Sequence, residues 1–398
     1  AGILDKAIQY FYQAGRSSVY RTANREAIGH FQKALELLGG LPESPERDGQ
    51  ELALQMEVQG PLITTFGWGD PRVERAAERA YLLAEQVGEN ALLVPVLFQA
   101  AMFEACARSV PRGIDLGERL LALAQELTDD SGIILAHLLL GLLNASAGNL
   151  VGARDHFEEV LCRYDPVQHH PLALLSGLDP GVASAGHLSW LTAHMGFLDQ
   201  AIAYKERALQ LAEELGHPHS LSFVHNMVMW AHFRRREIDA ARKEIDAGGE
   251  ICRAHGFGSQ AGLVESFSAL VQVAEGRTDQ AARLGARGLS LQRSTGLKLL
   301  SSVNIWILAT AYAAAGDHDR ALAVLDEADE LMGSFGEKLM QPALMLCRAQ
   351  VILEADGESA AEKLMLESLQ LAHDRQDGWH KLHAAMALAR LWRGEGKH

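Results

Sequence analysis

"AGDHDRA", residues 315–321, is the stretch of sequence from which the fold can be worked out. Taken alone, its centre Asp317-His318-Asp319 could be a set of metal ligands, an acid–base group or the polar tip of a turn. The stretch has three counterparts, each 40 residues before the next, so it belongs to a series. These counterparts are "MGFLDQA", "RREIDAA" and "EGRTDQA", which end at Ala201, Ala241 and Ala281.

Only small residues and one aspartate recur in this series, which are the parts that a helix–turn–helix connection needs. Asp319 is therefore interpreted as a residue at the start of a helix, and His318 as a solvated side chain. A second marker has the same period, and five glycines carry it. The first four lie 40 residues apart and the last follows after 42: Gly216, Gly256, Gly296, Gly336 and Gly378. Two independent markers of one period predict a repeat protein.

Each 40-residue unit is predicted to hold two helices. Apolar residues recur at helical spacing between Gly296 and Gly316, and again from Asp317 to Gly336. The glycines suit the left-handed position after a helix, and the aspartate suits the following N-terminus. Each of these stretches ends in an alanine, such as Ala321, whose small side chain would let the second helix pack closely on the first.

The spacing of small residues resembles the tetratricopeptide signature, in which Leu-Gly-x-x-Tyr precedes Ala-x-x-x-Phe. Leu140-Gly141 precedes Ala153-x-x-x-Phe157, and Ala14-Gly15 precedes Ala27-x-x-x-Phe31. In each case the first small residue lies 12 positions before the second. The resemblance implies an all-α fold, a right-handed superhelical solenoid of about nine and a half helix–turn–helix repeats.

One spacing is longer than the others and divides the chain. Ala153 and Ala201 lie 48 residues apart, and the surplus falls in "YDPVQHHPLALLSGLDPGV". We therefore expect repeats in residues 1–164, an inserted loop in 165–181 and further repeats in 182–398, all in one continuous solenoid. Long loops in such arrays often lie on a binding face, although a packing insert explains the sequence equally well. The candidate site residues of the insert are His169, His170 and Asp179.

Composition limits the function. The net charge is −15, which argues against a nucleic-acid partner. The basic run Arg234-Arg235-Arg236 is interpreted as a solvated helix end. Four scattered cysteines favour a reducing, cytoplasmic setting. No apolar run is judged long enough for a membrane span, and neither a signal peptide nor an initiating Met opens the sequence, so we expect a piece of a longer chain.

Several segments resemble a narrower group. "ANREAIGHFQKALELL", "HHPLALLSGLDPGVASAGHLSW" and "LHAAMALARLW" are similar to the C-terminal helical region of large bacterial signalling ATPases. In that family a class III adenylate/guanylate cyclase domain often comes first, followed by a STAND-type ATPase and tetratricopeptide-like repeats. The resemblance implies a regulatory arm of a nucleotide-driven switch. No P-loop motif occurs in this sequence, so ATP binding would belong to residues outside it.

Nothing in the sequence predicts catalysis, and no cofactor or metal is expected. Histidines are concentrated between positions 169 and 232, where His187/His194 and His225/His232 are pairs seven residues apart. Two turns of helix separate the members of each pair by about 10 Å, so one pair cannot chelate a single ion. Hydrogen bonds at helix ends and between helices are the simpler interpretation.

The tryptophans suggest where a partner could bind. Trp190 and Trp230 each lie 11 residues before a marker alanine, and Asn226 and Trp306 each lie 15 before one. These places resemble the groove-facing positions on the first helices of tetratricopeptide repeats, and Phe233 lies near the same face. An aromatic groove could hold a peptide or a small apolar ligand, while packing within the core is the alternative.

Three functions therefore remain open. The first is a non-catalytic scaffold or sensor module that binds a protein or peptide, or the ATPase domain of its own chain. The second is a small-molecule sensor with a pocket among the aromatic residues. The third is a metal-dependent enzyme that uses the histidine-rich segment, and it would need a convergent set of ligands that the sequence does not provide.

Overall fold

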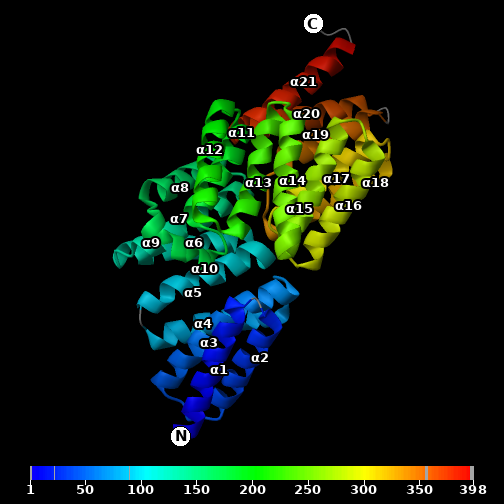
Figure 1. The fold of residues 1–398 in the computed structure, drawn as a ribbon. Coiled ribbons are helices and arrows are strands. Elements are labelled where there is room, and N and C mark those ends of the chain that lie inside the picture. Colours follow the sequence, from blue (N-terminus) through cyan, green and yellow to red (C-terminus); the bar gives the residue numbers. More distant parts are fainter. Residues whose placement is uncertain (1, 22, 89, 355–356, 395–398) are drawn as a thin grey trace. The chain divides into compact units, whose positions relative to one another are not determined.

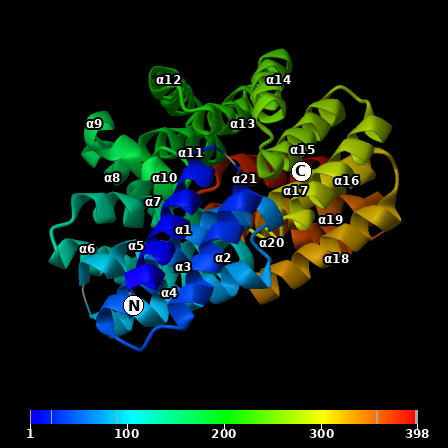
Figure 2. The same cartoon turned by 60° about the horizontal axis from the view of Figure 1, so that its bottom comes forward.

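The computed structural model describes residues 2–21, 23–88, 90–354 and 357–394. Within these ranges the chain forms α-helices joined by short turns, with one π-helical and one 3₁₀ turn and no strand. The predicted all-α fold of helix–turn–helix repeats is confirmed. Figures 1 and 2 show the helices in sequence order from blue to red.

The chain divides into two compact units, which are considered separately. The first comprises residues 1–108, 112–136 and 294–297. It contains α1 (Gly2–Tyr20), α2 (Asn24–Gly39), α3 (Pro45–Phe66), α4 (Pro71–Val87), α5 (Asn90–Phe103) and the π turn Glu104–Arg108. It also contains parts of α6 (Val110–Glu126) and α7 (Asp130–Ala147). This division differs from the predicted boundaries at 164 and 181, which stay a prediction.

The second unit comprises residues 109–111, 137–293 and 298–398 and carries the site described below. Its helices are α8 (Leu150–Arg163), α9 (Pro166–His169), the 3₁₀ turn His170–Leu172, α10 (Ala173–Ser176), α11 (Pro180–Met195), α12 (Leu198–Leu215), α13 (Pro218–Arg234), α14 (Ile238–His255), α15 (Gly258–Ala274), α16 (Thr278–Ser294), α17 (Ser301–Ala314), α18 (His318–Phe335), α19 (Gln341–Glu354), α20 (Glu358–Asp374) and α21 (Gly378–Gly394).

The turns within successive repeats share one backbone geometry. The left-handed position recurs every 40 residues and is taken by Gly196, Arg236, Gly276 and Gly316, with φ between 62° and 91°. Glycine adopts this conformation at little cost, whereas an arginine there is strained by about 1–2 kcal/mol. Arg236 is thus the exception in the series, and it lies at the site described below.

The predicted glycine marker after the second helix is confirmed for four of its five members. Gly216, Gly256, Gly296 and Gly336 all have positive φ. Gly378 does not belong with them, because the left-handed position of that turn is taken by Gln376 and Gly378 is the first residue of α21.

Small residues let large ones pack between the paired helices. Ala201, Ala241, Ala281 and Ala321 are all completely buried. A Cβ atom added at Gly141 would lie 2.7 Å from the Phe157 ring. Gly15 faces Phe31 in the same way. The signature spacing therefore has a direct cause, since an aromatic ring of the second helix fills the space over a glycine of the first.

The opening stretch is resolved as a capped turn. Asp317 is the N-cap of α18 and accepts a hydrogen bond from the Arg320 backbone N–H at 3.2 Å, while Asp319 lies in the first turn. His318 is not simply solvated as predicted, because its Nε2 lies 2.8 Å from a carboxylate oxygen of Glu354. The stretch positions a helix and forms no catalytic group.

The interpretation that no segment is long and apolar enough for a membrane span was wrong for α7. Among the described residues, this 18-residue helix alone has the length and composition to cross a membrane, and 61% of it is buried within the fold.

Glu337 lies in the segment between α18 and α19, and its carboxyl group is completely buried against the start of α17. Its two oxygens accept hydrogen bonds from the Ser302 hydroxyl at 2.7 Å and the Ser302 backbone N–H at 3.4 Å. Burial raises the pKa of Glu337 to about 7, although the hydrogen bonds from Ser302 oppose this shift. The folded protein therefore holds a proton at Glu337 between about pH 4.5 and pH 7, where the unfolded chain has lost it.

We expect Glu337→Gln to stabilise the protein at pH 8 by about 2–3 kcal/mol and to have little effect at pH 4.5. The wild-type chain loses stability as the pH rises through this window, because the folded state must either keep the proton or bury a charge. Urea unfolding at both pH values measures the difference. An equal effect at pH 4.5 and pH 8 would show that the carboxyl group is not titrating.

Candidate functional site

Three of the predicted groove residues come together in the second unit. Trp190, Trp230 and Trp306 lie on α11, α13 and α17, and the rings of Trp230 and Trp306 are 6.3 Å apart. His194 lies between the first two, at 4.9 Å from the Trp190 ring and 5.9 Å from that of Trp230. However, Trp190 and Trp230 are only 5% and 1% exposed, so they pack in the interior and do not line an open groove.

Of the other two predicted residues of this face, Phe233 lies against Trp230 and Asn226 does not. Phe233 packs its ring edge-on against Trp230 at 6.1 Å. Asn226 is completely buried where α13 faces Gly248 of α14, and neither its amide N nor its amide O has a hydrogen-bond partner. Its place is thus between the paired helices.

Arg234 occupies the position that the aromatic residues enclose. It was interpreted as part of a solvated helix end, but its side chain is only 3% exposed. Its guanidinium carbon lies 5.0 Å from the Trp230 ring centre and 4.5 Å from that of Trp379. Nη2 is 3.1 Å from Nε2 of His194, whereas Nε and Nη1 have no partner.

Burial has a marked effect on the charges here. Loss of solvation lowers the pKa of Arg234 to about 9, despite the attraction of Asp377, so the group remains mostly protonated at neutral pH. Burial, followed by the repulsion of Arg234, also lowers the pKa of His194 well below its usual range. His194 is therefore neutral and can accept the hydrogen bond from Arg234.

Asp377 fixes the start of α21 beside this cation. Its carboxylate accepts hydrogen bonds from the backbone N–H of His380 at 3.0 Å and from the ring Nδ1 of His380 at 2.6 Å. Burial alone would raise the pKa of Asp377, but attraction to His380 and these hydrogen bonds hold it well below its usual range. His380 in turn packs its ring 5.2 Å from His194 and 6.3 Å from Trp306.

A glycine allows the close approach of α21 to α11. A Cβ atom at Gly378 would lie only 2.4 Å from the Met195 carbonyl oxygen and 3.5 Å from Cα of Gly196. No real side chain tolerates the first of these distances, so the approach requires glycine. We call this contact of the start of α21 with the ends of α11 and α13 the junction.

A groove of about 570 Å³ opens at the junction. The turn after α11, the turn after α13 and one face of α21 form it, and we call it the junction groove. It is lined by Gly196, Leu198, Asp199, Arg234, Arg235, Arg236, Glu237, Trp379, Leu382, His383 and Met386.

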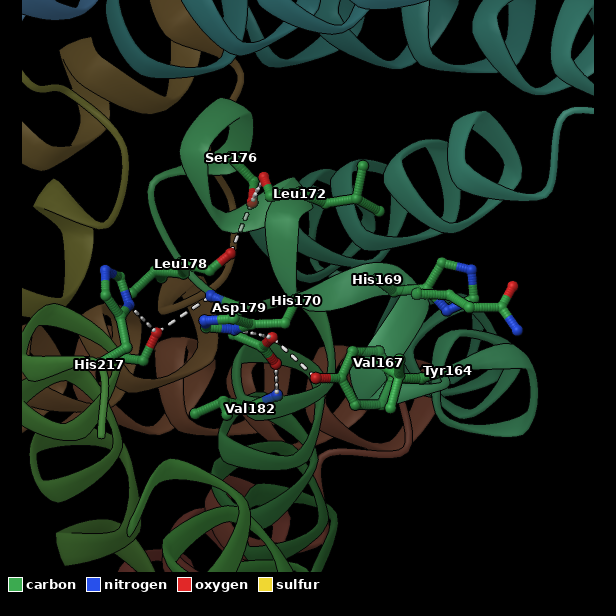
Figure 3. A network of polar contacts seen from close by, with 12 residues as sticks. Tyr164, Val167, His169, His170, Leu172, Ser176, Leu178, Asp179, Val182 and His217 are labelled. Carbon is green, nitrogen blue, oxygen red and sulfur yellow. Dashed lines mark hydrogen bonds and ion pairs between the residues drawn. The ribbon is translucent and has the colours of Figure 1, made fainter. Parts of the chain in front are cut away.

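Figure 3 shows that two of the insert residues predicted as a binding site, His170 and Asp179, contact each other and that Asp179 also bonds to residues on either side of the insert. The carboxylate of Asp179 is completely buried and accepts hydrogen bonds from the Tyr164 hydroxyl at 2.8 Å and from the Val182 backbone N–H at 2.9 Å. His170 Nδ1 lies 3.1 Å from the same carboxylate. Burial, and then the hydrogen bond with Asp179, raise the pKa of Tyr164 well above its usual value.

The remaining contacts also give the insert a structural role. His169 is 3% exposed, and its Nδ1 accepts a hydrogen bond from the backbone N–H of Asp165 at 2.9 Å. A Cβ atom at Gly181 would lie 2.5 Å from the Tyr164 ring, so this glycine of "LDPGV" makes room for the tyrosine. The motif therefore caps α11 and holds the insert against it.

His225 and His232 both lie near the carboxylate of Glu244, at 2.7 and 3.7 Å from its oxygens, whereas His187 and His194 have separate partners. His225 Nδ1 contacts a Glu244 oxygen at 2.7 Å, and His232 Nδ1 contacts a Glu237 oxygen at the same distance. His187 bonds to the backbone oxygen of Ala183, within its own helix. In the part of the chain that the structure describes, no three histidine, cysteine or acidic residues are grouped to hold a metal ion. All four cysteines are free.

Sequence reasoning missed Arg234, Asp377, Trp379 and His380. One signal was available, because Arg236 replaces the glycine that its counterparts have and Arg234 lies one turn after Trp230. The approach of α21 to α11 and α13, which end 183 and 144 positions before it begins, had no local signal.

Comparisons with known proteins identify the fold. No protein-family model matches the chain. An uncharacterised protein of Rhizobium meliloti is 24% identical over 358 residues, which are 88% of this chain and 34% of that protein, so the chain spans about a third of its relative.

The crystal structure of apo RapI superposes with a TM-score of 0.56 at 12% identity, over 72% of this chain and 98% of RapI. A STAND protein with a tetratricopeptide repeat sensor from Pyrococcus horikoshii gives 0.47 at 15% identity, over 92% of this chain and 52% of that one. The chain is a tetratricopeptide-like all-α solenoid.

Proposed function

We propose that the chain is a non-catalytic regulatory arm, which binds a protein partner and passes the state of its junction on to that partner. The observation that carries this proposal is the junction itself. Arg234 is a buried cation that α11, α13 and α21 share, and it has two nitrogen atoms without hydrogen-bond partners. A contact that encloses such a group is only marginally favourable, so a bound partner or ligand can shift it between closed and open states.

In this proposal the partner is the rest of a longer signalling protein. The resemblance to the C-terminal helical region of STAND-type signalling ATPases supports this assignment, as does a relative about two and a half times as long as the chain. The arm would act in the cytoplasm on an ATPase domain. Sequencing the complete gene tests the assignment, since a P-loop motif is expected upstream and a long flanking sequence without any nucleotide-binding motif would contradict it.

Site-specific photo-crosslinking tests the interaction. We expect that replacing Phe197, which is 44% exposed beside the junction groove, with benzoylphenylalanine yields crosslinks to a protein segment in cells that contain the full-length protein. The matched control is the same replacement at Val167, which is 89% exposed on the insert and lies on α9. Crosslinks from Val167 but none from Phe197 would contradict an interaction at the junction.

A further inference from the structure

We infer that the junction groove binds a small organic acid, whose carboxylate pairs with Arg234 and whose apolar part lies against α21. The inference rests on the proposed function, since it names the signal that the arm would detect. Four observations carry it: the uncompensated charge of Arg234, the engagement of the nearest carboxylate elsewhere, the excess of positive charge in the groove, and the apolar face of α21.

The charge of Arg234 is not compensated within the protein. Its hydrogen bond is to the neutral His194, and its two flanking tryptophan rings supply only the weaker attraction of cation–π contacts. Among the described residues no carboxylate lies within ion-pair distance of Arg234, and its Nε and Nη1 have no partner. A buried cation in this state is costly, and an anion would relieve that cost.

Asp377 attracts Arg234, but its carboxylate is hydrogen-bonded to His380 at the start of α21. It is 2% exposed, and its two oxygens are engaged by the backbone and the ring of His380. To pair with Arg234 directly, it would have to give up the N-cap of α21. The place for a second anion is therefore on the other side of the guanidinium, where Arg234 borders the groove.

The junction groove itself carries an excess of positive charge. Arg235 is neutralised by Glu237 at 2.8 Å and by Asp199 at 3.7 Å, so both acidic residues of the groove are engaged. Arg236 adds a second cation, whereas burial lowers the pKa of His383 and keeps it neutral. In a chain of net charge −15, this local excess favours an anionic ligand.

One face of α21 supplies an apolar wall. Trp379, Leu382 and Met386 lie at the spacing of a single helix face, and Leu382 is 54% exposed. The volume of about 570 Å³ falls within the range of small-molecule sites. Because the Arg234 guanidinium lies 4.5 Å from the centre of the Trp379 ring, a carboxylate that binds to it changes the surroundings of that ring, which makes tryptophan fluorescence a direct reporter.

The test is a titration of the chain with phenylacetate, acetate and 2-phenylethanol, followed by tryptophan fluorescence and calorimetry. Phenylacetate is expected to bind saturably and at least about tenfold more tightly than acetate, which lacks the apolar group, or 2-phenylethanol, which lacks the charge. No saturable binding of phenylacetate would mean that the groove does not accept an organic acid. Equal binding of 2-phenylethanol would mean that charge plays no part. Either result overturns the inference.

Two variants locate the binding. Arg234→Met is expected to weaken phenylacetate binding at least tenfold, while Arg253→Ala, which removes an exposed cation of α14 outside the groove, should change it less than about twofold. If Arg234→Met does not fold, Leu382→Glu serves instead, because it places a negative charge at an exposed position in the groove and should weaken binding to a similar extent. Unchanged affinity in a folded Arg234→Met protein or in Leu382→Glu would overturn the assignment. The crosslinking result at Phe197 is independent, so failure of the ligand and failure of the partner can be told apart.

Discussion

Trp230→Ala is expected to lower the free energy of unfolding of the second unit by about 3–5 kcal/mol, the usual cost of removing a large buried aromatic side chain. Trp230 is 1% exposed, and its ring contacts those of Phe267 at 5.4 Å and Trp306 at 6.3 Å. It also covers one side of Arg234, which would be left beside a cavity. Urea unfolding followed by circular dichroism measures the loss.

The matched control for this variant is Phe197→Ala, which truncates an aromatic residue that is 44% exposed and should change stability by no more than about 0.5 kcal/mol. A loss of less than about 1 kcal/mol for Trp230→Ala would contradict its assignment to the core. It would restore the original expectation that this tryptophan faces an open groove. Binding assays on Trp230 variants therefore need a measure of folding beside them.

Gly378→Ala is expected to destabilise the docking of α21 by about 2–3 kcal/mol, because the added methyl group would meet the Met195 carbonyl oxygen at 2.4 Å and the backbones would have to separate. The effect should be local. Backbone amides of α21 should exchange with solvent faster, while those of α13 keep their protection.

Gly333→Ala is the control for this effect, since nothing lies within 4 Å of the added methyl group and the residue is within α18. Alanine favours a helix over glycine, so this substitution should stabilise the chain by about 0.5–1 kcal/mol. If Gly378→Ala proved as favourable as Gly333→Ala, the close contact of α21 with α11 would not exist.

Local sequence determines most of this fold, which explains how much of it could be predicted. Helix pairs, left-handed turns and buried alanines recur at one period, and each depends on residues that are near one another in the chain. Gly141 and Phe157, only 16 positions apart, illustrate this. The exception among the turn markers was Gly378, whose small size is required by α11 and not by its own turn.

The site was harder to predict because long-range packing creates it. The period correctly placed Trp190, Trp230 and Trp306 near one another, but it could not show that α21 would cover them. Arg234 looked like a surface residue because it lies in a basic run at a helix end, but Trp230, His194 and Trp379 enclose it. Asn226 illustrates the opposite error, since its helix face was taken as the groove although it faces the paired helix.

Hydrogen exchange of α21 in the wild-type chain tests the central claim most directly, namely that this helix closes on α11 and α13 around Arg234. The account predicts that amides in the first half of α21 are protected to a degree similar to those of α13, and that saturating phenylacetate increases their protection further. Exchange of α21 at the rate of an unfolded peptide, while α13 and α19 remain protected, would contradict it.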